Sequence, residues 1–390
     1  MVYGSYRKAW AEISLDAIEE NIKAFQKELH PNTQLMAVVK ADGYGHGAVE
    51  VAKAAIRAGA DRLAVALLDE AILLRKSGVK APILILGYTP PDAVEEAISE
   101  NITITVYSKD VIHRIIQVAE AKKKIAKIHL KVDTGMGRIG VRTEEEALEL
   151  AKSISSDFVK LEGIFTHFAD ADNFKDSSYT YQQYEKFTEI LNYLKKNKIH
   201  IPIKHCCNTA ATISFPQMHL DMVRVGIGIY GVYPQEHFKN QILLKPSMSF
   251  KTKPTLIKKV PSSQSISYGR TYFSNQEALI ATIPIGYADG LCRQLSNRGE
   301  VTIRGKRVPI VGRICMDQSM IDVTGMENLS LDEVVTIFGD VHQGNISVEE
   351  IAKKLDTIPY EVFCLIGKRV PRVYLKNESQ IGVKSLINKL

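Results

Sequence analysis

Residues 37–47 read AVVKADGYGHG, and this stretch decides how the rest of the chain is interpreted. Residues 35–39 are apolar and partly β-branched, which is typical of a strand buried on both faces. The glycines that follow at 43, 45 and 47 permit a sharp turn. Lys40 lies between them, where apolar surroundings would disfavour its charged form and make it a nucleophile or base. The alternative at this position is a lysine that extends from the strand end into solvent.

Strand-like runs alternate with helical patterns from residue 35 to residue 231. Together they predict a (β/α)8 barrel of roughly 200 residues. A doubly wound open sheet is the runner-up, although no G-x-G-x-x-G fingerprint supports it. We expect strands at 36–40, 63–67, 83–87, 102–107, 128–133, 163–167, 204–207 and 222–228, with helices at 15–29, 48–58, 69–76, 93–100, 112–122, 144–154, 181–194 and 209–214.

The alternation of strand and helix patterns gives way to short β-rich runs near residue 245. Short β-rich runs, separated by turn residues, predict a mainly β domain with one helix at 351–355, behind a capping-box pattern at 347–350. A chain of 390 residues exceeds the usual size of one hydrophobic core. We expect a barrel over 12–240 and a mainly β domain made of 1–11 and 241–390. The β-rich runs lie at 248–252, 278–283, 301–303, 308–311 and 334–337.

Composition excludes several classes of protein. Apolar residues make up 45% of the chain and charged residues 24%, as in an ordinary folded protein. The net charge of +6 is modest, and the lysine clusters at 122–124 and 195–198 suit helix ends better than nucleic acid. Five cysteines without a C-x-x-C pair predict free thiols in a reducing compartment and no metal site. With no leader-like or membrane-length apolar run, we expect a cytoplasmic protein without a membrane partner.

Chemically distinctive residues fall where the predicted strands end. Lys40, the segment 131–138, His167, the pair at 208–209 and the segment 224–226 each follow or close a different strand. In a barrel of this kind the active site is built at the carboxyl ends of the strands, and the last two loops commonly bind phosphate. The alternatives are a capping role for Thr209 and a structural role for His167.

Stretch 37–47 closely resembles the lysine motif of alanine racemases. Similar matches occur at 129–138 (HLKVDTGMGR) and 223–231 (VRVGIGIYG), and the resemblance extends over nearly the whole chain. It implies a barrel enzyme that holds pyridoxal phosphate as a Schiff base on Lys40 and interconverts L- and D-alanine. By the same resemblance the enzyme is a homodimer that supplies D-alanine for bacterial peptidoglycan.

The resemblance also implies roles for the barrel residues. Arg224 would face the pyridine nitrogen of the cofactor, and because a guanidinium hardly gives up a proton, the ring would be a weak electron sink that discourages transamination. Arg138 would contact the phenolic oxygen and the substrate carboxylate. Lys131 would be an N6-carboxylysine that holds Arg138, the alternative being a plain lysine paired with Asp133. The other residues implied around the cofactor are Tyr44, His167, Asn208, Thr209, Gly226, Ile227 and Tyr360.

The β domain resembles the racemase segments that reach into a neighbouring subunit, at 267–269, 286–290 and 312–318. Tyr268 would then be the second base, acting on L-alanine, while Lys40 acts on D-alanine. Tyr287 and Met316 would bind substrate, and Asp172, Arg293 and Arg313 would line the entrance. The alternatives are a broad-specificity or serine racemase, and a non-catalytic pyridoxal-phosphate carrier, which needs no second domain.

Overall fold

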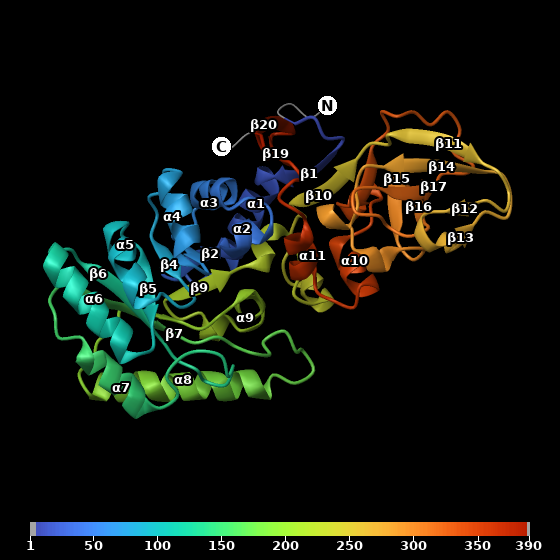
Figure 1. The fold of residues 1–390 in the computed structure, drawn as a ribbon. Coiled ribbons are helices and arrows are strands. Elements are labelled where there is room, and N and C mark those ends of the chain that lie inside the picture. Colours follow the sequence, from blue (N-terminus) through green and yellow to red (C-terminus); the bar gives the residue numbers. More distant parts are fainter. Residues whose placement is uncertain (1–4, 388–390) are drawn as a thin grey trace.

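The computed structural model describes residues 5–387, which form a barrel and a mainly β part side by side (Figure 1). The barrel occupies the left of this view, and the β part extends to the right as an arm. The molecule is therefore elongated, and the two parts present separate ends.

Eight parallel strands form the barrel, in the order β8-β7-β6-β5-β4-β3-β2-β9, and β9 pairs with β2. Backbone hydrogen bonds from Asp221 N to Lys204 O (3.1 Å) and from Arg224 N to Cys207 O (3.0 Å) join the region of β8 to β9. The sheet thus closes on itself, which confirms the predicted barrel and excludes the open sheet. The strands are β2 (Gln34–Val38), β3 (Arg62–Val65), β4 (Ile83–Ile85), β5 (Thr103–Val106), β6 (Ala126–Lys131), β7 (Val159–Phe165), β8 (Ile203–His205) and β9 (Met222–Val225).

Helices surround the barrel, as the alternating pattern predicted. In α1 the Ser14 hydroxyl accepts a hydrogen bond from Ala17 N, and Ile18, Ile22 and Phe25 are fully buried. No helix within residues 5–387 combines the length and the apolar character needed to cross a membrane. The helices of this part are α1 (Leu15–Glu28), α2 (Lys40–Tyr44), α3 (Ala48–Arg57), α4 (Leu68–Lys76), α5 (Val94–Ser99), α6 (Lys109–Lys122), α7 (Glu144–Ser153), α8 (Ser178–Lys196) and α9 (Thr209–Ser214).

All eight barrel strands end one to three residues earlier than the sequence predicted. The strand expected at 36–40 stops at Val38, and the strand expected at 222–228 stops at Val225. The apolar run after β9 continues into a 3-10 turn, η3 (Ile227–Tyr230), whose side chains are also buried. Apolar sequence therefore continues past the strands into buried loops, and periodicity alone could not place the boundary.

A ten-stranded sheet forms the β part, in the order β11-β14-β17-β16-β15-β18-β10-β1-β19-β20. Strand β1 comes from the amino terminus and lies between β10 and β19. This sheet confirms the predicted mainly β region after the barrel. Its strands are β1 (Ala9–Ser14), β10 (Met248–Thr252), β11 (Leu256–Val260), β14 (Ala278–Ile283), β15 (Glu300–Ile303), β16 (Lys306–Val311), β17 (Ser319–Asp322), β18 (Val335–Phe338), β19 (Arg372–Lys376) and β20 (Ser379–Lys384), and β12 (Ser265–Ile266) pairs with β13 (Tyr272–Phe273) in a separate ribbon.

Two helices interrupt the β part, where the sequence predicted one. The expected helix is α10 (Val348–Lys354), whose cap is Ser347, because its hydroxyl accepts from Glu350 N. The second, α11 (Pro359–Leu365), was not predicted. Its first residue is Pro359, which suits the first position of a helix but also marks turns, so the sequence pattern was ambiguous.

Candidate active site

A cavity of about 390 Å³ lies at the carboxyl ends of the barrel strands, within the size range of small-molecule sites. Lys40 follows β2 closely, and residues that follow β7, β8 and β9 contribute the opposite walls. The site residues predicted from the sequence that this cavity brings together are Lys40, Tyr44, His167, Asp172, Asn208, Thr209, Arg224, Gly226, Ile227 and Tyr360. Sequence analysis did not name four other lining residues, Leu86, Ala210, Pro234 and Cys364.

Lys40 begins a left-handed turn. Ala41, Asp42 and Tyr44 all have φ near +50°, and Gly43 lies between them with φ +63°. Such angles are costly for residues other than glycine and persist only where the surroundings enforce them. The sequence predicted the sharp turn from its glycines but not the strain at the other positions.

Side chains from two other elements hold this turn. Glu70 of α4 accepts a hydrogen bond from Ala41 N at 2.5 Å. The Asp42 carboxylate accepts from Ala48 N at 2.9 Å and pairs with Lys384 Nζ of β20 at 2.7 Å. Sequence reasoning missed Asp42, Glu70 and Lys384, although an aspartate beside glycines is a known signal of left-handed backbone.

One end of the cavity is lined by hydroxyl groups. A Cβ atom at Gly226 would lie 2.7 Å from the Tyr44 hydroxyl, so only glycine leaves room there. Thr209 Oγ1 accepts from Gly226 N at 2.9 Å, which leaves the threonine's own O–H free to donate into the cavity. The cap of α9 is Asn208, whose side chain accepts from Ala211 N, so the capping role considered for Thr209 belongs to its neighbour. Burial raises the pKa of Tyr44, which keeps its phenol a neutral donor.

Arg224 is the buried cation of this cavity, with a relative exposure of 3%. Its Nη1 donates to His205 Nδ1 at 2.9 Å, and its Nη2 donates to the carbonyls of Thr166 (2.9 Å) and Cys206 (3.0 Å) and lies 3.2 Å from His167 Nδ1. Burial lowers its pKa to about 10, so the guanidinium remains charged at neutral pH. Four contacts fix its plane and direction.

Positive charge dominates the cavity. Burial, followed by the charge of Arg138, lowers the pKa of Lys40, as the sequence analysis expected for a desolvated lysine. Burial and then Arg224 hold the pKa of His167 well below its usual value, so this imidazole is neutral. A set of hydroxyl donors beside buried cations is suited to an anionic small molecule.

Lys131 lies deep in the barrel, with a relative exposure of 2%. Burial, and then Arg224, lower its pKa to about 7. Its Nζ donates to Val132 O at 2.6 Å, and Asp133 instead accepts hydrogen bonds from Gly135 N and Gly137 N. Lys131 and Asp133 therefore bond to backbone groups and do not form the simple pair considered as an alternative.

Arg138 is exposed and does not line the cavity, although its charge reaches Lys40, Lys131 and Arg224. Among residues 5–387, no three histidine, cysteine or acidic side chains gather in a way that could hold a metal ion.

Apart from Tyr360, the predicted residues of the β part form a second cluster, which does not line the cavity. The Ser267 hydroxyl donates to Arg313 O, and Tyr287 N donates to Cys315 O at 3.0 Å, so the three predicted segments pack together. Tyr268 lies between β12 and β13, at the end of the molecule away from the barrel (Figure 1). The exposed fractions are 71% for Tyr268, 42% for Tyr287 and 53% for Met316, and Arg293 and Arg313 are also exposed.

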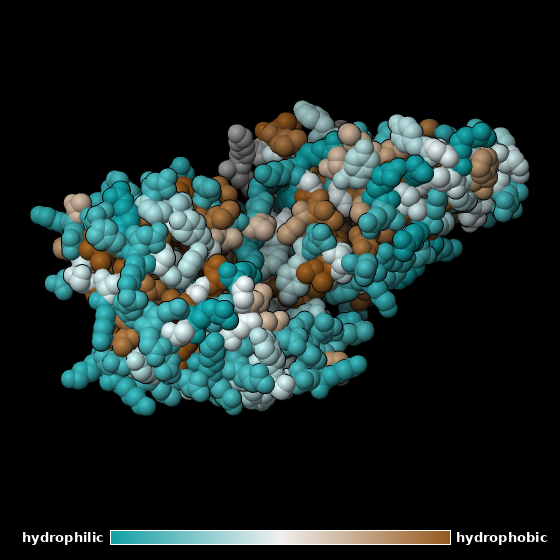
Figure 2. Space-filling view, turned by 60° about the horizontal axis from the view of Figure 1, so that its bottom comes forward, coloured by the Kyte–Doolittle hydropathy of each residue, from teal (hydrophilic) through white to brown (hydrophobic). Residues whose placement is uncertain are grey.

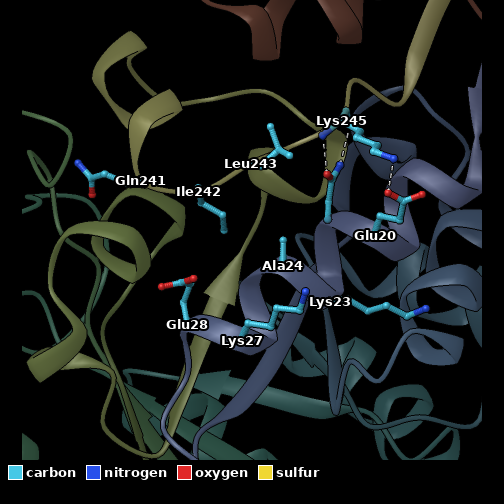
Figure 3. Close-up of a pocket in the computed structure, with 10 residues that line it drawn as sticks. Glu20, Lys23, Ala24, Lys27, Glu28, Gln241, Ile242, Leu243 and Lys245 are labelled. Carbon is cyan, nitrogen blue, oxygen red and sulfur yellow. Dashed lines mark hydrogen bonds and ion pairs between the residues drawn. The ribbon is translucent and has the colours of Figure 1, made fainter.

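A different pocket lies between α1 and residues 241–245 (Figure 3). Its walls carry charges of both signs, and Lys245 pairs with Glu20 at 2.5 Å. None of the predicted site residues lines it. The strand-end cavity is therefore the candidate active site.

The fold and this cavity define a lysine-centred enzyme built on a (β/α)8 barrel. Comparison with known proteins is more specific: the family description "Alanine racemase, N-terminal domain" matches residues 13–234, and "Alanine racemase, C-terminal domain" matches residues 247–374. The chain therefore belongs to the alanine racemase family, which confirms the predicted family and the prediction that it is an enzyme.

Similar proteins agree over the full length. "Alanine racemase 2" of Oceanobacillus iheyensis is 57% identical over 389 residues, covering 100% of this chain and 99% of that protein. The crystal structure of alanine racemase from Bacillus anthracis with bound L-Ala-P is 40% identical with a TM-score of 0.92, covering 97% of this chain and 98% of that one. The histidine racemase of Leuconostoc mesenteroides is 29% identical with a TM-score of 0.83, covering 96% of this chain and 100% of that one.

The low pKa of Lys131 predicts a specific pH dependence of stability. The folded state releases the lysine proton near pH 7 and the unfolded state near 10.5, so between these values the unfolded state binds more protons and stability rises with pH. In the unsubstituted protein Lys131 should make the free energy of unfolding rise by at most about 1.4 kcal/mol per pH unit over this range, and Lys131→Met should lack this contribution. The measurement is urea unfolding at pH 7, 8 and 9 in buffers free of carbon dioxide.

Lys53→Met is the control for this prediction, because Lys53 is 42% exposed on α3. This variant should keep the pH slope of the unsubstituted protein. Equal slopes for the Lys131→Met variant and the unsubstituted protein would contradict a Lys131 pKa near 7.

Proposed function

We propose that this chain is an alanine racemase that interconverts L- and D-alanine with pyridoxal phosphate on Lys40. The observation that carries the proposal is the single cavity in which Lys40, Arg224 and the Tyr44–Thr209 hydroxyl groups converge. Most of this cavity was anticipated from the sequence because its residues follow successive barrel strands.

The residues present fit the cofactor. Glycine at 226 lets the Tyr44 hydroxyl approach the backbone closely, and a phosphate group at this end of the cavity would contact Tyr44, Thr209, Ile227 and Tyr360. A phosphate would offset the excess of buried positive charge described above. Lys40 would carry the cofactor covalently, and Asn208 and His167 would flank it. The contribution of this group is to make the Cα proton of alanine acidic.

Arg224 determines which reaction follows. Its charged guanidinium, fixed by four contacts, cannot readily protonate a pyridine nitrogen opposite it. Arg224 would thereby keep a bound cofactor a weak electron sink, which suits return of the proton to Cα rather than transamination. Racemisation is therefore the outcome that this residue favours.

Racemisation needs one base on each face of Cα. Burial lowers the pKa of Lys40, which favours its role as the base that removes or returns the proton on the face of D-alanine. Tyr268 would serve the face of L-alanine, but within one chain it lies far from the cavity (Figure 1). We infer that it reaches the cavity of a partner subunit.

A two-fold dimer would place the β-part cluster of each chain over the barrel of the other. Three observations support it: the cluster is exposed, it carries aromatic and methionine side chains, and apolar patches lie on the surface where the two parts meet (Figure 2). In this arrangement Tyr287 orders the substrate, Met316 N–H binds its carboxylate, and Arg293 and Arg313 face Asp172 at the entrance. In this proposal the cofactor-binding barrel spans 12–240 and the β domain is made of 1–11 and 241–390, with β1 (Ala9–Ser14) continuing from the sheet of the β domain to the start of the barrel.

Lys131 would be carboxylated in the working enzyme. An amine with a pKa near 7 is substantially neutral at physiological pH, and only a neutral amine can add carbon dioxide. The resulting anion would orient Arg138 toward the phenolic oxygen of the cofactor and the substrate carboxylate.

Alanine is favoured as substrate by the family, and D-alanine made in the cytoplasm would supply peptidoglycan. A broad-specificity or serine racemase is the competing enzyme, because a small apolar pocket rejects one extra hydroxyl poorly. A non-catalytic carrier is disfavoured by the exposed cluster around Tyr268, which such a protein does not need.

Lys40→Ala tests the function directly. Incubated with L-alanine and pyridoxal phosphate, the unsubstituted protein should form D-alanine, measured by chiral chromatography, and should retain cofactor after borohydride reduction. The variant should do neither, because attachment and one base are lost together. Lys80→Ala, at an exposed lysine, is the control and should behave like the unsubstituted protein. A cofactor adduct that persists on another lysine of the Lys40→Ala protein would contradict the assignment.

Tyr268→Phe tests the second base. Loss of the hydroxyl should slow exchange of the Cα proton of L-alanine with deuterated solvent by about a hundredfold or more, and that of D-alanine far less. The measurement is proton NMR of each enantiomer separately. Tyr272→Phe is the matched control, because this nearby hydroxyl bonds to Asp322 instead. Equal slowing for both enantiomers in the Tyr268→Phe protein would count against a base on each face.

A further inference from the structure

A row of buried side chains runs from Arg224 across the barrel interior. Arg224 Nη1 lies 2.9 Å from His205 Nδ1, and His205 Nε2 lies 2.9 Å from His129 Nδ1. His129 Nε2 lies 3.3 Å from Glu162 Oε2, and the same oxygen pairs with Arg62 Nη1 at 2.7 Å. Both imidazoles are completely buried. The row therefore connects the cavity to a carboxylate on β7 through two imidazoles that no part of the proposed mechanism uses.

The direction of these hydrogen bonds follows from Arg224. A guanidinium has only donors, so His205 Nδ1 must accept and the proton of that ring is on Nε2. His205 Nε2 then donates to His129 Nδ1, which leaves the His129 proton on Nε2, where it donates to Glu162. All three links point the same way, and both rings are neutral Nε2–H tautomers. Because Arg224 cannot accept a proton, the row fixes polarity and does not conduct protons.

The row also supplies the anion that Arg224 otherwise lacks. Its other contacts are neutral, namely two carbonyls and the His167 imidazole. Burial alone raises the pKa of Glu162, but hydrogen bonds from His129 and Arg62 lower it to about 2, so the carboxylate stays ionised. The other charged groups near the row are cationic: Lys127 Nζ lies 3.7 Å from Glu162, and the charge of Lys131, on β6, helps to lower the pKa of His205 after burial and Arg224.

We propose that His205, His129 and Glu162 are positioning residues for Arg224, forming a one-way hydrogen-bond row that fixes the guanidinium toward the cavity. This inference rests on the proposed function, in which Arg224 faces the pyridine nitrogen. If Glu162 loses its charge, Arg224 is held less firmly and would do less to keep the cofactor's ring nitrogen unprotonated. A bound cofactor would then support transamination, which releases pyruvate, more often relative to racemisation.

The first test concerns the unsubstituted holoenzyme and requires no activity. Selective ¹⁵N labelling of histidine, with each ring assigned through a His→Gln variant, reports which nitrogen carries the proton. The row requires both His129 and His205 to be neutral and protonated on Nε2. A proton on Nδ1 of either ring, or a doubly protonated ring, overturns the proposal.

The second test compares Glu162→Gln with Glu19→Gln. Glutamine at 162 keeps an acceptor for His129 but removes the charge, while Glu19 is a matched carboxylate on α1, paired with an arginine and a lysine in the same way. The ratio of pyruvate to D-alanine should rise about twofold or more in Glu162→Gln. A twofold change corresponds to the smallest coupling energies measured between residues of one hydrogen-bonded network. It should be unchanged in Glu19→Gln.

This ratio does not depend on how much active protein remains, so a merely structural role for Glu162 would leave it constant. An unchanged ratio in Glu162→Gln, or an equal rise in Glu19→Gln, overturns the proposal. Absence of D-alanine from the unsubstituted protein would instead contradict the proposed function, and the tautomers would still be decided by the first test.

Discussion

Lys40 and Arg224 line one cavity, and the charges of Lys131 and Arg138 also act on its side chains. This concentration of positive charge shapes the rest of the site. Burial is the main reason why the pKa values of Lys40 and Lys131 are lowered, and the charges of Arg224 and Arg138 lower both further. These surroundings disfavour the charged form of both lysines, and the neutral amine is the form that chemistry at an amine requires. The proposed cofactor phosphate and the proposed carboxylation of Lys131 would each add negative charge near these cations, and Glu162 supplies a more distant negative charge.

A second constraint is the backbone turn that fixes the direction of Lys40. Ala41, Asp42 and Tyr44 accept left-handed conformations because Glu70 and Lys384 hold the turn from two sides. Lys384 belongs to β20, so the β part stabilises the lysine turn of its own chain as well as carrying the cluster proposed for a partner. Strain of this kind is found where geometry matters for function.

The sequence predicted the barrel and most of the cavity because both follow from periodic patterns and strand ends. The turn at Ala41, the capping role of Asn208 and the row from Arg224 to Glu162 were not predictable in this way. The turn and the row depend on contacts between residues far apart in the sequence, such as His129 with His205, 76 positions apart. Residue types along the chain do not specify such pairs. The Asn208 cap is a local contact with Ala211, and the prediction considered this role for Thr209 instead. Helix α11 was missed because proline occurs both at the first position of helices and in turns.

The central claim is that each catalytic site combines a barrel from one chain with a β-part cluster from another. The most direct measurement mixes two inactive proteins, Lys40→Ala and Tyr268→Phe, in equal amounts after dissociation and lets them re-pair. About half the dimers are then mixed, and each mixed dimer holds one intact site, so racemisation should return to about a quarter of the unsubstituted level. A site built within one chain gives no recovery, and a re-paired mixture as inactive as its two parents would contradict the account.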